Sequence, residues 1–98
     1  MLKAIIIDDE PYCCEILAAM LASDCPDVEV VSICSNASQG LAAIRQLSPD
    51  LVFLDVEMPR MNGFEMLEQL PTINFHLIFT TSYDQYALKA IRFSAIDY

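Results

Sequence analysis

Residues 2–9 read LKAIIIDD, and residues 51–55 read LVFLD. Each stretch is a short apolar run of a kind that is typical of a buried strand in a parallel sheet. Each run ends directly in aspartate, with Asp8 and Asp9 after the first and Asp55 after the second. The carboxyl ends of parallel strands meet at one edge of an open sheet, where functional groups gather. The sequence therefore predicts that three carboxylates converge at that edge.

Three carboxylates in one place repel one another unless a divalent cation joins them. Mg²⁺ prefers hard oxygen ligands, and a carboxylate is a competent nucleophile for phosphoryl transfer. Taken alone, Asp8 and Asp9 would also fit a solvated turn at the start of a helix. Because Asp55 follows a neighbouring strand, we favour a magnesium site beside a nucleophilic aspartate.

Composition limits the classes of protein to which the chain can belong. Its 98 residues suit one domain, predicted here over 1–98, and 55% hydrophobic content allows a sizeable core. The net charge is −9 with only five Lys and Arg, which argues against direct nucleic-acid binding and against docking on an anionic membrane. No apolar stretch approaches the length of a membrane span and no signal peptide is seen, so we expect a cytoplasmic protein.

Four cysteines are present without a C-x-x-C spacing. We expect them to be reduced and mostly buried rather than to form disulfides or bind zinc.

Strand and helix patterns alternate along the chain, which predicts an α/β fold with a doubly wound parallel sheet and right-handed crossovers. The expected strands cover residues 2–7, 28–34, 51–54, 76–80 and, as the start of a fifth strand, 96–98. The expected helices begin at Pro11, after Asn36 or Ser35, near Gly63 and near Tyr83. We expect Ile16, Leu17, Met20 and Leu21 to form the packed face of the first helix, and Gly63 to supply a backbone conformation that other residues resist.

The chain stops where a fifth strand would begin, so we expect a domain truncated at that point. The apolar strand at 76–80 would then be an exposed edge. Such an edge favours homodimerisation or segment swapping.

The segment LDVEMPRMNG at residues 54–63 resembles the phosphoacceptor loop D-x-x-M-P-x-M-[DN]-G of bacterial response regulator receiver domains. The acidic group at 8–10, the hydroxyl residues at 80–82 and the aromatic Tyr98 resemble further motifs of that family, in the same order. The resemblance covers the whole chain. It implies a flavodoxin-like sheet with strand order 2-1-3-4-5.

The resemblance also implies a role for each matching acid. Asp55 would accept a phosphoryl group from a sensor histidine kinase. Asp9 and Asp55 would bind Mg²⁺ directly, together with the backbone carbonyl of Glu57, and Asp8 would hold the metal through water. The domain would be a switch that catalyses its own phosphorylation, not a metabolic enzyme.

Signal output is implied by the same resemblance. Thr81 would bond to the phosphoryl oxygen, and Tyr98 would change rotamer in step with it. Residues 83–90 and 95–98 resemble receivers joined to LytTR-type DNA-binding domains, which implies an attached effector that binds DNA. The family places a phosphoryl-binding lysine three residues beyond the aromatic, and the chain ends before it.

Two other functions stay open at this point. An aspartate-nucleophile phosphohydrolase needs a second acid two residues after its nucleophile, and Glu57 has that spacing from Asp55. A module that binds partners without being phosphorylated is the other alternative.

Overall fold

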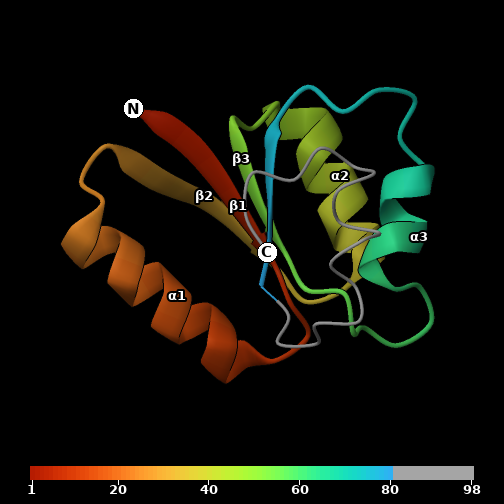
Figure 1. Cartoon of the computed structure of the whole chain (residues 1–98), viewed down its shortest axis with the longest axis horizontal. Helices are drawn as coiled ribbons and strands as arrows, with labels where there is room; N and C mark the ends of the chain where they lie inside the picture. The colour runs from red at the N-terminus through yellow and green to blue at the C-terminus, as the bar shows by residue number, and fades with distance from the viewer. Residues whose placement is uncertain (81–98) are drawn as a thin grey trace.

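A computed structural model of the chain describes residues 1–80, in which strands and helices alternate (Figure 1). The elements are β1 (Leu2–Ile7), α1 (Pro11–Asp24), β2 (Val28–Cys34), α2 (Ala37–Leu47), β3 (Leu51–Leu54), α3 (Gly63–Glu68) and β4 (His76–Phe79). The predicted strands at 2–7, 28–34 and 51–54 are confirmed, and β4 ends one residue before the predicted limit. The helix expected near Tyr83, the start of a fifth strand, Thr81 and Tyr98 lie outside the described residues.

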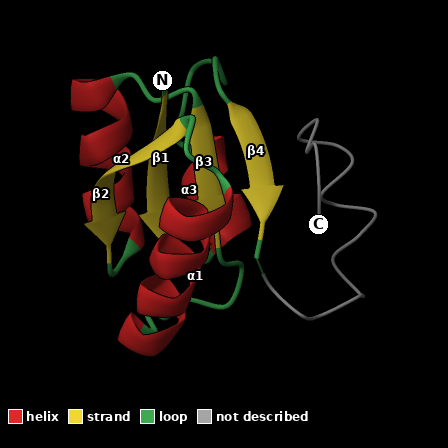
Figure 2. Ribbon diagram, turned by 90° about the vertical axis from the view of Figure 1, so that its left-hand side faces the viewer, coloured by secondary structure: helices red, strands yellow, loops and turns green. Residues whose placement is uncertain are grey.

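The four strands form one parallel sheet in the order β2-β1-β3-β4, which confirms the predicted doubly wound arrangement (Figure 2). The register places Ile7 of β1 opposite both Cys34 of β2 and Leu54 of β3. Neighbouring strands therefore end at the same level. Since Asp8 follows Ile7 and Asp55 follows Leu54, this register brings the two acids to the same edge of the sheet.

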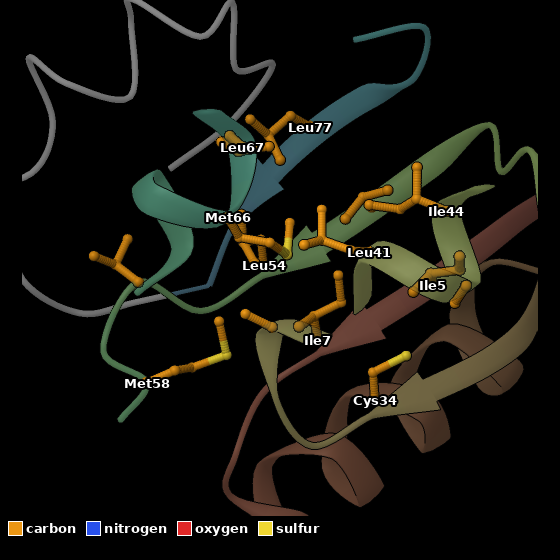
Figure 3. Packing of buried hydrophobic residues seen from close by; sticks show 14 of the residues in the cluster. Ile5, Ile7, Cys34, Leu41, Ile44, Leu54, Met58, Met66, Leu67 and Leu77 are labelled. Atoms are coloured by element: carbon orange, nitrogen blue, oxygen red, sulfur yellow. The ribbon is translucent and has the colours of Figure 1, made fainter. Parts of the chain in front are cut away.

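Helices cover both faces of the sheet, with α1 on one side and α2 and α3 on the other (Figure 1). Alternation along β1 explains how one strand serves both layers. Ile6 packs in the cluster beneath α1, whereas Ile5 and Ile7 pack in the larger cluster beneath α2 and α3 (Figure 3). Phe64 of α3 and Phe79 of β4 are in ring contact there, with centroids 5.1 Å apart. The carboxyl part of β1, from Ala4 to Ile7, is thus held within the core, and the buried run continues into Asp8.

The packed face of α1 differs from the prediction. Cys14, Leu17, Ala18 and Leu21 pack against the sheet, whereas Ile16 and Met20 are 43% and 55% exposed. The inner face thus combines two leucines with the small side chains of Cys14 and Ala18. The expectation of mostly buried cysteines is half right, since Cys14 and Cys34 are buried, Cys25 is partly buried and Cys13 is exposed.

Asparagine side chains cap two helices. Asn36, one of the two predicted caps, accepts a hydrogen bond from the Gln39 N–H at 2.8 Å and starts α2. Asn62 and Glu65 form a reciprocal capping box at the start of α3, with both bonds 2.9 Å long.

The amino ends of the strands are held by a separate set of bonds around Lys3. Its backbone N–H donates to the Asp50 carboxylate at 2.8 Å, and its ammonium donates to the carbonyl of Leu47 at 2.7 Å. The Asp50 N–H in turn donates to the Lys3 carbonyl at 2.8 Å. These bonds tie the end of α2 and the start of β3 to β1. None of the helices within residues 1–80 has the length and apolar character needed to cross a bilayer.

Candidate functional site

The carboxylates of Asp8, Asp9 and Asp55 lie together at the carboxyl edge of the sheet. One oxygen from each falls within 4.8 Å of the other two. This confirms the convergence predicted from the strand ends. The parallel register of β1 and β3 produces it, because Asp8 and Asp55 leave neighbouring strands at the same level.

Asp8 is the most enclosed member of the group, with 8% of its surface exposed. Its N–H donates to the Cys34 carbonyl at 3.0 Å, which extends the β1–β2 pairing by one step. Its Oδ1 accepts from the Glu10 N–H at 2.9 Å. Burial raises the pKa of Asp8, and the charge on Asp9 adds to that rise, while the Glu10 N–H opposes it.

Asp55 is fixed at both its backbone and its side chain. Its N–H donates to the Ile7 carbonyl at 2.9 Å, and its Oδ1 accepts from the Glu57 N–H at 3.2 Å. Burial raises the pKa of Asp55 to about 6, and the nearby charge of Asp8 contributes. A carboxylate with this pKa is mostly ionised at neutral pH, at the cost of repulsion from its neighbours.

The loop between β3 and α3 is organised around one backbone carbonyl. The Val56 carbonyl accepts from both the Met58 N–H and the Gly63 N–H, each at 3.0 Å. The Met58 side chain is 7% exposed and belongs to the larger core cluster (Figure 3). Met58 therefore anchors the loop in the core. Sequence reasoning missed this role of Val56, because a backbone acceptor leaves no signal in the residue type.

The predicted backbone role of Gly63 is wrong. Its φ is not positive, and the residue of this loop that adopts a left-handed conformation is Arg60, with φ of 71°. Gly63 is needed for space instead. A Cβ added there would lie 2.7 Å from the Asp55 carbonyl oxygen.

The other predicted site residues are not part of the carboxylate group. Glu57 is exposed, and its N–H bonds to Asp55, while its carbonyl stays a predicted ligand. Thr80 follows β4 and its N–H donates to the Leu54 carbonyl at 3.0 Å. Thr81 and Tyr98 fall beyond the part of the chain that the structure describes.

The donor set suits a hard divalent cation. Three carboxylates supply oxygen atoms, which are the ligands that Mg²⁺ prefers. Within residues 1–80, the charges that raise the pKa of Asp55 all come from carboxylates, namely Asp8, Asp9 and Glu57. A bound cation would relieve their mutual repulsion. The residues present therefore fit the predicted magnesium ion.

Comparison with known proteins gives a consistent result. A family model described as "Response regulator receiver domain" matches residues 4–98. The chain is 43% identical over its whole length to "Transcriptional regulatory protein BtsR" of Escherichia coli, and 48% identical to an "Uncharacterized response regulatory protein" of Vibrio cholerae. It spans 41% of the length of each of these relatives.

A solved structure agrees in both fold and sequence. The receiver (REC) domain of AraT, described as a response regulator from Geobacillus stearothermophilus, superposes with a TM-score of 0.85. The match covers 99% of this chain and 78% of that one, at 32% identity. The sheet order and the helix layers found above are those of this fold.

Proposed function

Because the chain belongs to the response regulator receiver domain family, we propose that Asp55 is its phosphoacceptor and that a sensor histidine kinase is the phosphoryl donor. The observation that carries this proposal is the convergence of Asp8, Asp9 and Asp55 within 4.8 Å. Asp55 is the member of the group that follows β3 and lies in the family's loop motif. The receiver is a signalling switch, and we propose that it spans residues 1–98.

Mg²⁺ is the cofactor that we assign to this group. Asp9 and Asp55 would hold it directly with the Glu57 carbonyl, and Asp8 would act through water. When bound, the ion supplies charge neutralisation for a phosphoryl group that adds about two negative charges to an acidic edge.

The chain's own residues prepare the acceptor carboxylate. The Glu57 N–H holds Oδ1 of Asp55, and the bond from the Asp55 N–H to the Ile7 carbonyl fixes its backbone. An Asp55 oxygen attacks the phosphorus of the phosphohistidine. The P–N bond breaks, the histidine nitrogen leaves, and an acyl phosphate remains on Asp55. Ionised Asp55 is the reactive form, since a carboxylate and not the neutral acid is the nucleophile.

Output is proposed to pass through Thr81 and Tyr98, with Thr81 bonding to the phosphoryl oxygen and Tyr98 changing rotamer. One relative is named a transcriptional regulatory protein, and the chain spans less than half of its length. We infer that the receiver controls an attached effector that binds DNA, of the LytTR type. We also propose that it works in the cytoplasm, where such an effector would meet its DNA.

Mass spectrometry after incubation with acetyl phosphate and Mg²⁺ tests the acceptor. The native chain should gain one phosphoryl group and Asp55→Asn should gain none. Asp27→Asn is the matched control, because Asp27 is an exposed aspartate beside the start of β2, at the opposite edge of the sheet. Equal labelling of the native chain and Asp55→Asn would refute the assignment. Repeated turnover of a small phosphate ester would instead favour a phosphohydrolase.

A further inference from the structure

Gly63 stands in direct contact with the backbone of the acceptor residue. It is the first residue of α3, and its N–H donates to the Val56 carbonyl at 3.0 Å. A Cβ at this position would meet the Asp55 carbonyl oxygen at 2.7 Å and the Val56 Cα at 3.2 Å. Real Cβ atoms essentially never approach another heavy atom as closely as 2.7 Å. Any side chain at position 63 would therefore displace the peptide that joins Asp55 to Val56.

The same peptide is held from the opposite direction by β1. The Asp55 N–H donates to the Ile7 carbonyl at 2.9 Å, and Ile7 directly precedes Asp8. The start of α3 and the end of β1 thus enclose the acceptor residue between them. A shift of the Asp55–Val56 peptide away from α3 would change the separation of Asp55 from Asp8.

The start of α3 is itself fixed. The capping box between Asn62 and Glu65 closes both of its bonds at 2.9 Å. Gly63, Phe64, Met66 and Leu67 are all buried, so the helix is also anchored in the core. The start of α3 therefore has little room to move away from the Asp55–Val56 peptide.

We propose that Gly63 is a positioning residue for the metal-binding carboxylates: the absence of a side chain lets α3 begin against the Asp55–Val56 peptide, and this contact sets the place of Asp55 relative to Asp8 and Asp9. The inference rests on the proposed function, because the geometry that it protects is that of the magnesium site. Gly63 acts through the loop backbone and touches neither metal nor phosphoryl group.

The chain offers a matched control in Gly40, which is its other glycine. Gly40 is also buried in a helix, and a Cβ there would lie 2.7 Å from Cδ1 of Ile7. The Cβ would also lie 3.2 Å from Cγ1 and Cγ2 of Ile7, so all three contacts are with side-chain atoms and none is with the backbone. Gly40→Ala therefore adds the same methyl group to the core without pressing on the backbone of an acidic residue.

The test is a Mg²⁺ titration of the intact protein followed by the amide signals of residues 55–57 in two-dimensional NMR. Gly63→Ala should move these signals before metal is added and should weaken Mg²⁺ binding about 10-fold or more, the scale seen when support behind a metal ligand is lost. Gly40→Ala should bind Mg²⁺ within about two-fold of the native chain, whatever its stability. Equal affinity of Gly63→Ala and the native chain would overturn the inference.

A substitute variant and the native chain itself separate failure of this inference from failure of the proposed function. If Gly63→Ala does not fold, Asn62→Ala replaces it, because loss of the cap loosens the start of α3 without adding an atom. The cap contributes about 1 kcal/mol, so Mg²⁺ binding should weaken by up to about 5-fold, and unchanged affinity would overturn the inference. Failure of the native chain to bind Mg²⁺ would instead overturn the proposed function, and with it this role of Gly63.

Discussion

Replacing Asp55 by asparagine should stabilise the metal-free protein at neutral pH. Burial, with a contribution from the charge on Asp8, raises the pKa of Asp55 from 3.8 to about 6, so the folded state disfavours its ionised form. At about 1.4 kcal/mol per pKa unit, this rise corresponds to about 3 kcal/mol. Asp55 is only partly buried, and screening by solvent reduces the expected gain to roughly 1–2 kcal/mol.

The size of the effect changes with pH in a defined way. Above pH 6 the Asp55 carboxylate is charged in both the folded and the unfolded state. The full free-energy cost of burying its charge then lowers the stability of the folded protein. Below about pH 4 Asp55 is protonated in both states, and this cost disappears. The advantage of Asp55→Asn should therefore be complete above pH 6 and should be lost as the pH falls from about 6 to 4.

Urea denaturation with EDTA, at several pH values, measures this difference. At pH 7.5 the variant should unfold at a higher temperature by about 5–10 °C in a parallel thermal scan. Mg²⁺ at about 100 times its Kd should stabilise the native chain by about 2.7 kcal/mol and the variant by much less. Asp27→Asn should show neither pattern. A variant no more stable than the native chain at pH 7.5 without metal would refute the reasoning.

Three other substitutions test separate parts of the structure. Asp8→Asn should weaken Mg²⁺ binding by roughly 10-fold or more in a calorimetric titration, and unchanged affinity would show that Asp8 does not support the metal. Asn36→Ala should lower the free energy of unfolding by about 1 kcal/mol, because the Gln39 N–H loses its cap; Asn36→Asp, which keeps the acceptor oxygen, should lose less. Phe79→Ala should cost about 3–5 kcal/mol in urea denaturation, since the ring is 2% exposed and contacts Phe64; a loss below 1 kcal/mol would mean that the core collapses around the gap.

The strands and the acidic group could be predicted because their signals are local. An apolar run that ends in aspartate predicts the position of a strand and the edge of the sheet at which the aspartate lies. Pro11 and Asn36 likewise marked helix starts through their own chemistry. Convergence of Asp8 and Asp55 then followed from one topological rule about parallel sheets.

The wrong predictions concern the packed face of α1 and the role of Gly63, which both depend on tertiary contacts. Helix α1 carries apolar residues on more than one side, so hydrophobicity alone did not distinguish Leu17 and Leu21, which pack, from Ile16 and Met20, which do not. Which side of α1 packs depends on how the helix is rotated against the sheet, and that is a tertiary feature. Gly63 was misjudged for a similar reason, since its constraint comes from the carbonyl of a residue eight positions earlier and not from its own φ.

The bonds around Lys3, Leu47 and Asp50 lie at the amino edge of the sheet, and the acidic group lies at the carboxyl edge. The two edges of the sheet therefore differ in role. The amino edge, the first pole, stabilises the fold, and the carboxyl edge, the second pole, holds the reactive carboxylates. Thermostabilising changes made at the first pole would leave signalling intact. Changes at the second pole, by contrast, would act directly on the carboxylates proposed to hold the metal and accept the phosphoryl group.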